Sequence, residues 1–162
     1  MHWLIGSGDN ATHISYVLVA LGINFKVIGR GKESAQKFQS KTNIEVITGG
    51  LENYLDLKPD IPDSVILSVN HEHLYELAQI LLNYGVKKIL IEKPAAISPA
   101  EIRNLYTAVK SNKANIKIAY NRRFLSSVEK VQRLIEKDGG LQSLHFDFTE
   151  WTHLIDELPK DK

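Results

Sequence analysis

The stretch HWLIGSGDNA, residues 2–11, passes from a short apolar run directly into two closely spaced glycines. It fits the pattern G-x-G-x-x-G/A, with Gly6, Gly8 and Ala11 at the three defining positions. Gly6 permits a tight turn, Gly8 removes the side chain that would block a pyrophosphate, and a small residue at position 11 lets a helix pack closely on a strand. The pattern therefore predicts the phosphate-binding turn of a dinucleotide site.

The helix that would begin in this turn directs its free N–H groups and its positive dipole end at the phosphates. Asp9 and Asn10 occupy the variable positions and are included in the predicted cofactor-binding residues. Asp9 is unfavourable there, because a carboxylate repels a pyrophosphate unless it points outward or caps the helix. A strand-to-helix turn that binds nothing is the alternative interpretation of the motif.

Five further apolar runs follow the first one, and segments of helical period separate them. The six runs are residues 3–5, 25–28, 44–47, 65–69, 89–91 and 116–119. Several are almost continuously apolar, which is typical of parallel strands covered on both faces. Strands and helices that alternate with short connections predict the α/β class and a doubly wound parallel sheet, the Rossmann fold.

Three segments between these runs carry apolar residues at the spacing i, i+3, i+4, i+7 of one helix face. The three stripes are Ile14, Val17, Leu18 and Leu21; Leu74, Leu77, Ala78 and Leu81; and Ile102, Leu105, Tyr106 and Val109. Gly22 and Gly85 are predicted to end the first two of these helices in a left-handed conformation. Ser98 to Glu101 predicts the start of the third, with an N-cap, a proline at N1 and a capping-box glutamate.

The composition excludes several functional classes. The 162 residues include 20 Lys and Arg and 19 Asp and Glu, and this near-zero net charge argues against a broad nucleic-acid-binding surface. Because the chain has no cysteine, disulfides, cysteine catalysis and thiolate metal sites are excluded. No apolar run approaches the ~20 residues of a membrane span, and no signal peptide fits the first residues. We expect a cytoplasmic protein without nucleic-acid or membrane partners.

The end of the second apolar run bears on the choice of cofactor. Residues 27–32 read VIGRGK, with no Asp or Glu where an acid would bond the 2′-hydroxyl of an adenosine ribose. Arg30 and Lys32 could hold a 2′-phosphate instead, the arginine through two hydrogen bonds. This favours NADP over NAD, with Gly29 and Arg30 among the cofactor-binding residues. A solvated basic turn is the alternative, and another adenine nucleotide is disfavoured by the same missing acid.

Four stretches together resemble the family of glucose-fructose oxidoreductase, inositol dehydrogenase and MocA, which are NAD(P)-dependent sugar oxidoreductases. The stretches are GSGDNA at 6–11, SVNHEH at 68–73, IEKP at 91–94 and AYNRRF at 119–124. The resemblance covers about residues 2–152, and Glu-Lys-Pro followed by Asn-Arg-Arg-Phe is its most specific part. It implies hydride transfer between a nicotinamide and a secondary alcohol or ketone of a small sugar-like or cyclitol substrate.

The resemblance implies that Lys93 is catalytic. Its ammonium would hydrogen-bond the reacting oxygen of the substrate and stabilise the charge that develops during hydride transfer. Glu92 would position the lysine or contact the cofactor. Pro94, which a cis bond often precedes in the family, would hold the turn that carries Lys93. A surface turn without function is the alternative for this tripeptide.

Asn70 and His73 match family positions that line the cofactor crevice. His71 and His73 could instead be metal ligands, but no cluster with metal-ligand spacing supports this, and we predict no metal site. Asn121 and Arg123 match residues at the hinge into the family's second domain, on the cofactor or the substrate side. A solvated turn is the alternative for these two residues.

The pattern changes after residue 137. The segment LHFDFT, residues 144–149, alternates strictly and predicts the first strand of a truncated second domain of α+β type. We therefore expect an NAD(P)-binding domain over residues 1–125, followed over 126–162 by a connecting helix and this strand. Since one strand cannot form a domain, either the chain is a fragment of a longer protein or the strand pairs with another subunit. We expect pairing with a second copy of the chain in a homo-oligomer.

The family's second half carries an Asp-x-x-x-His motif that supplies the general acid/base, and no such motif occurs in the second half of this chain. A positioned acid/base contributes about 10²–10⁴-fold to such a reaction, so turnover by this chain alone is in doubt. The alternative function is therefore a non-catalytic dinucleotide-binding or interaction module.

Overall fold

The computed structural model describes residues 1–147. The chain divides after Tyr120 into a compact first unit, Met1–Tyr120, and a second unit that begins at Asn121. The boundary expected from the sequence, between residues 125 and 126, lies slightly later. It stays a prediction for the domain organisation of the whole protein.

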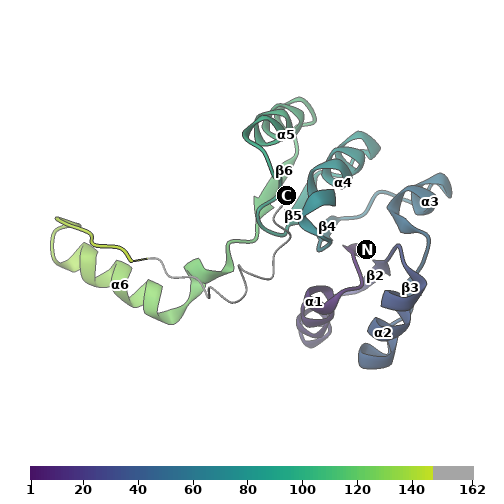
Figure 1. The fold of residues 1–162 in the computed structure, drawn as a ribbon, viewed down its shortest axis with the longest axis horizontal. Coiled ribbons are helices and arrows are strands. Elements are labelled where there is room, and N and C mark those ends of the chain that lie inside the picture. The colour runs from purple at the N-terminus through teal and green to yellow at the C-terminus, as the bar shows by residue number, and fades with distance from the viewer. Residues whose placement is uncertain (148–162) are drawn as a thin grey trace, which may run out of the picture. The chain divides into compact units, whose positions relative to one another are not determined.

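Strands and helices alternate along the whole first unit (Figure 1). The strands are β1 His2–Ile5, β2 Phe25–Ile28, β3 Val46–Ile47, β4 Ser64–Leu67, β5 Lys88–Ile91 and β6 Asn115–Ile118. The helices are α1 Asp9–Ala20, α2 Lys32–Thr42, α3 Gly50–Asp56, α4 His71–Tyr84 and α5 Pro99–Ser111. No helix in the described part of the chain is long and apolar enough to cross a membrane.

All six strands are parallel and lie in the order β3-β2-β1-β4-β5-β6, which confirms the predicted doubly wound sheet. Ile5, at the end of β1, is in register with Ile28 of β2 and Leu67 of β4. The first half of the chain therefore adds its strands on one side of β1, and the second half adds its strands on the other side. Ligands of open α/β sheets bind at such a switch point, outside the carboxyl ends of the strands.

Helices cover both faces of the sheet, α1 and α2 on one face and α3, α4 and α5 on the other (Figure 1). Neighbouring residues of one strand contribute to the two cores in turn. Leu4 packs with Ala11 of α1 and Phe38 of α2, whereas Ile5 belongs to the larger core beneath α3, α4 and α5. This alternation explains why the strands are apolar without a break.

The predicted helix ends are confirmed. Gly85 is the C-cap of α4 with φ +106°, and Gly22 follows α1 with φ +65°. Ser98 caps α5 by accepting a hydrogen bond from the Glu101 N–H at 3.2 Å, and Pro99 is the first helical residue. The Glu101 carboxylate in turn accepts from the N–H of Ile97, one residue before the cap.

Two of the three apolar stripes are not buried as their spacing predicts. In α5, Ile102 and Tyr106 are exposed and only Leu105 is buried. In α1, the side chains of Val17 and Leu21 are exposed, and the helix buries Ala11, Ser15 and Leu18 instead. Small residues let this helix approach the strands closely, so they decide which side of it faces the sheet. Apolar spacing alone cannot distinguish that side from an adjacent one.

The second unit begins with a short 3₁₀ turn, Asn121–Phe124, followed by helix α6, Ser126–Lys137. The expectation of a strand at 144–149 is wrong for residues 144–147, which form no strand. A strand needs the backbone of a neighbour to complete its hydrogen bonds, and the described residues of this unit contain none. The end of the predicted strand, residues 148 and 149, lies outside the described residues.

Candidate functional site

A cavity of about 320 Å³ opens at the carboxyl ends of β1, β2 and β4, where the sheet changes direction. We call it the switch-point cavity. It is lined by Ile5, Gly6, Ser7, Gly8, Ile28, Gly29, Arg30, Gly31, Ser34, Gly50, Leu51, Glu52, Val69, Asn70, His73 and Leu77. Two larger hollows, near the end of α6 and along one face of the sheet, contain none of the predicted site residues.

The structure brings six predicted cofactor-binding residues together at this cavity. They are Gly6, Gly8, Gly29, Arg30, Asn70 and His73. Ser34, Gly50 and Glu52 also line the cavity but were not predicted from the sequence. The double glycine at 49–50, directly after the third apolar run, is a signal that would have indicated Gly50 and Glu52, since loops that follow parallel strands meet at one edge.

Two glycines are required by close backbone approach. Gly6 has φ +115°, and a Cβ there would lie 1.9 Å from the carbonyl oxygen of Ser68 on the neighbouring strand's loop. A Cβ on Gly29 would lie 2.8 Å from Ser7 Oγ and 3.0 Å from Val46 Cγ1. The backbone at both glycines therefore lies so close to its neighbours that a side chain at either position would push the walls of the cavity apart.

Gly8 is different, because a Cβ there would meet nothing within 4 Å. It is the N-cap of α1 in an extended conformation, with φ −85° and ψ −175°, and no side chain caps this helix end. Beside it, Ser7 Oγ donates to Ser34 Oγ at 3.0 Å, and Ser34 Oγ donates to the Gly31 carbonyl at 3.1 Å. The helix start thus faces open space, as the approach of a phosphate requires. The residues present fit a dinucleotide pyrophosphate.

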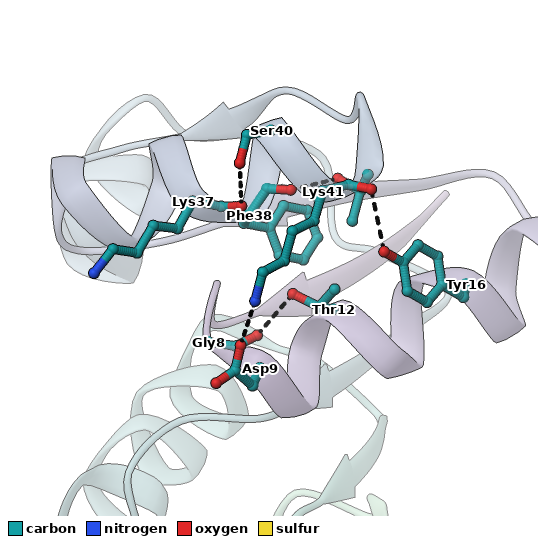
Figure 2. A network of polar contacts seen from close by, with 9 residues as sticks. Gly8, Asp9, Thr12, Tyr16, Lys37, Phe38, Ser40 and Lys41 are labelled. Carbon is teal, nitrogen blue, oxygen red and sulfur yellow. Dashed lines mark hydrogen bonds and ion pairs between the residues drawn. The ribbon is translucent and has the colours of Figure 1, made fainter.

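Asp9 points outward, which is one of the two arrangements that relieve its repulsion of a phosphate. Its Oδ1 accepts a hydrogen bond from Lys41 Nζ of α2 at 2.8 Å, and Tyr16 donates to the Lys41 carbonyl (Figure 2). The hydrogen bond and the charge of Lys41 lower the pKa of Asp9, and the same hydrogen bond raises the pKa of Lys41. The ion pair joins α1 to α2 beside the cavity, and Asp9 does not line it.

Replacing Lys41 with methionine should raise the pKa of Asp9 toward its ordinary value of 3.8, because its main stabilising partner is lost. A lowered pKa means that the pair stabilises the fold above pH 3.8 and that this contribution is lost as the pH falls through the folded pKa. A carboxyl NMR titration measures the change. Lys37→Met is the matched control, since Lys37 is the weakest of the cations that act on Asp9. An unchanged Asp9 titration in Lys41→Met would contradict the assignment.

Asn70 and His73 reach the cavity because α4 begins immediately after β4. Asn70 is the N-cap of α4, and its carbonyl accepts a hydrogen bond from the His73 N–H at 3.0 Å. His73 is half-buried, while His71 is exposed. Within residues 1–147, no three His, Asp or Glu side chains lie close enough together to hold a metal ion.

Lys93 lies on the same edge of the sheet as the cavity but does not line it. Lys93 follows β5, and β4 lies between β5 and β1 in the sheet. The strand that carries Lys93 is therefore two strand spacings, of about 4.8 Å each, from β1. Glu92 and Lys93 stay near the sheet because the Glu92 N–H donates to the Leu67 carbonyl of β4. The peptide bond between Lys93 and Pro94 is cis, and both side chains are exposed. Glu92, Lys93 and Pro94 remain predicted site residues outside the cavity.

The other predicted residues also lie outside the cavity. Asn10 is exposed in the first turn of α1, and Ala11 is completely buried beneath that helix, where it packs with Leu4. Asn121 and Arg123 lie in the second unit, both exposed, with the Arg123 guanidinium 5.6 Å from the ring centre of Phe124. The structure does not assign them to the site.

Residues 10–120 match the model of an oxidoreductase family with an NAD-binding Rossmann fold. The match spans more than half of the chain and contains most of the cavity. The chain belongs to the GFO/IDH/MocA oxidoreductase family. The resemblance found in the four motifs is therefore confirmed. A comparison with curated proteins gives no match.

Solved structures with the same fold include dehydrogenases crystallised with nicotinamide cofactors. GenD2 from gentamicin A biosynthesis, in complex with NAD, has a TM-score of 0.75 at 18% identity and is matched over 89% of this chain and 41% of its own. The WlbA dehydrogenase from Bordetella pertussis, in complex with NADH and UDP-GlcNAcA, has a TM-score of 0.74 at 16% identity over 84% and 41%.

A third solved structure with this fold is the UDP-N-acetylglucosamine 3-dehydrogenase GnnA from Acidithiobacillus ferrooxidans. Its TM-score is 0.68 at 16% identity, over 82% of this chain and 41% of its own. At such identities the likeness concerns the fold alone. The present chain spans about 41% of the length of each of these proteins.

Proposed function

We propose that the first unit binds NAD(P) in the switch-point cavity, with the pyrophosphate over the Gly6–Gly8 turn and the start of α1. The main support for this proposal is the open space at Gly8. It lies on a wall of the cavity where Gly6 and Gly29 leave no room for a side chain. The adenosine end would lie toward Arg30, at the end of β2. We propose a preference for NADP, because Arg30 and Lys32 offer cations where a 2′-phosphate would lie.

A fluorescence titration of the purified chain with NADPH and with NADH tests the proposal. Nicotinamide emission changes when the ring leaves water, so binding is measured without any turnover. We expect saturable binding of both dinucleotides, with NADPH the tighter ligand. If neither dinucleotide binds at millimolar concentration, the proposed function is overturned.

The proposal extends to hydride transfer between the nicotinamide and a secondary alcohol or ketone of a sugar-like molecule. The cofactor would supply the hydride chemistry, and the family and the sugar-nucleotide dehydrogenases of the same fold support this substrate class. Lys93, exposed on the cavity's edge of the sheet, would donate a hydrogen bond to the reacting oxygen. Glu92 would orient that loop, while Asn121 and Arg123 would contribute from the cofactor or the substrate side.

Lys93→Ala separates binding from chemistry. Because Lys93 does not line the cavity, the dissociation constants for NADH and NADPH should stay within about twofold of the wild-type values. Any reduction of NAD(P) that depends on a panel of sugars should fall by about 10²-fold or more, the effect of removing one oxyanion-type donor. Unchanged sugar-dependent activity would exclude Lys93 as a catalytic residue.

The second candidate function is a binding module without turnover. Residues 14–162 contain no Asp-x-x-x-His, the acid/base motif of the family, and this favours the second candidate. This candidate is selected if the wild-type protein binds the dinucleotides normally but shows no sugar-dependent reduction of NAD(P) across the same panel.

We also propose a cytoplasmic location, which suits a nicotinamide cofactor and a chain without cysteine. Self-association through residues 144–149 is part of the same proposal. Residues 144–147 form no strand in the single chain, and a second copy would supply the backbone partner that a strand needs. Light scattering measures the mass in solution. A monomeric mass at a concentration on the order of 100 micromolar would contradict self-association.

A further inference from the structure

The loops that follow β2 and β3 are joined by backbone hydrogen bonds at the adenosine side of the cavity. The Gly50 N–H donates to the Gly29 carbonyl at 3.0 Å, and the Gly49 N–H donates to the Arg30 carbonyl at 3.4 Å. These bonds hold the start of α3 against the turn that carries Arg30. An acidic side chain in the first turn of α3 is therefore held close to the guanidinium.

That side chain is Glu52, whose Oε1 accepts a hydrogen bond from Arg30 Nη2 at 3.1 Å. Both residues line the switch-point cavity, and their side chains are 45% and 61% exposed, so water and a ligand can reach the pair. Gly50 lies against both of them, since a Cβ there would come within 3.2 Å of Glu52 Oε2 and 3.6 Å of Arg30 Nε. No other residue described by the structure forms an ion pair with Arg30.

We infer that Glu52 determines cofactor specificity by competing with a 2′-phosphate for Arg30, an inference that rests on the proposed binding of NAD(P). A guanidinium binds a phosphate best through two parallel N–H donors, and Glu52 already occupies one terminal nitrogen. Binding of NADP must therefore break or share this ion pair. NAD carries a neutral 2′-hydroxyl and requires no such exchange. Glu52 thus weakens the NADP preference that Arg30 provides.

Glu52→Gln removes the charge while keeping the size of the side chain. Since exposed ion pairs are worth up to ~1 kcal/mol, we expect the affinity for NADPH to rise about fivefold relative to that for NADH. The affinity for adenosine 2′,5′-bisphosphate relative to that for 5′-AMP should rise in the same way, because the contact involves only the adenosine end. The shift should vanish in about 1 M NaCl, where the screening length is about 3 Å.

Two further variants complete the test. Glu45→Gln removes the same charge from an exposed residue just before β3, which does not line the cavity, and should leave the NADPH/NADH ratio unchanged. In an Arg30→Met background, Glu52→Gln should lose most of its effect, since the contested partner is gone. Circular dichroism establishes that each variant is folded.

The outcomes separate the inference from the proposed function. If both dinucleotides bind but Glu52→Gln leaves their ratio unchanged, or shifts it equally in the Arg30→Met background, the competition is disproved while NAD(P) binding stands. If neither dinucleotide nor adenosine 2′,5′-bisphosphate binds to wild type, the proposed function fails and the inference fails with it. A shift toward NADPH that requires Arg30 supports the inference.

Discussion

Replacing Gly6 with alanine should cost more than about 3 kcal/mol of the free energy of unfolding, the largest loss expected for any single methyl group added to this chain. A backbone with φ +115° is accessible almost only to glycine, and the new Cβ would lie 1.9 Å from the Ser68 carbonyl oxygen. Neither side of that contact can move, because β1 and β4 are paired through their full length. Urea unfolding followed by circular dichroism measures the change.

Gly22→Ala is the matched control for Gly6→Ala. Gly22 also has a positive φ, +65°, but a Cβ there meets nothing within 4 Å. This variant should lose only about 1 kcal/mol, the cost of the left-handed conformation alone. If the two variants lost the same free energy, the close approach of β1 to the Ser68 loop would play no part in stability.

The second large effect is expected on binding. Gly8→Ala should weaken NADPH and NADH binding by about tenfold or more, which corresponds to ~1.4 kcal/mol, because the added Cβ projects into the space where the pyrophosphate would lie. The fold should lose at most about 1 kcal/mol, the difference between glycine and alanine at an N-cap. Fluorescence titration and urea unfolding of the same sample measure the two quantities.

Comparison of Gly6→Ala with Gly8→Ala therefore separates the two roles that one glycine motif combines. We expect Gly6 to act on the stability of the fold and Gly8 on the affinity for the ligand. Normal dinucleotide affinity in a folded Gly8→Ala protein would show that the pyrophosphate does not lie over the start of α1, and the proposed binding mode would have to be abandoned.

The sequence predicted the parts of the fold that depend on local pattern. Six apolar runs predicted six strands, and their alternation with helices predicted a parallel, doubly wound sheet, which the structure confirms. The ends of α4 and α5 were also predictable, because Gly85 and Ser98 act on the residues beside them. The strand expected at 144–149 was wrong over 144–147, since alternation does not supply the neighbour that a strand requires.

The candidate site could be predicted only where a motif indicated it. Gly6, Gly8, Gly29 and Arg30 follow the first two strands, and the loop after the fourth strand contributed Asn70 and His73. The orientation of α1 could not be predicted, because Ala11 and Ser15 rather than the larger apolar residues face the sheet. The outward orientation of Asp9 could not be predicted either, because it depends on the hydrogen bond from Lys41 of α2.

The sequence by itself determined the fold class, the family motifs and the glycine turn, because each depends on residues that are close together in the chain. Only the tertiary structure placed Glu52 against Arg30, two residues 22 positions apart, and so completed the wall of the cavity at the end of β2. The physical reason is that β3 pairs with β2, which brings the loops after both strands to one edge and joins them by backbone hydrogen bonds. A contact of that kind depends on the order of strands in the sheet, and no local pattern encodes that order.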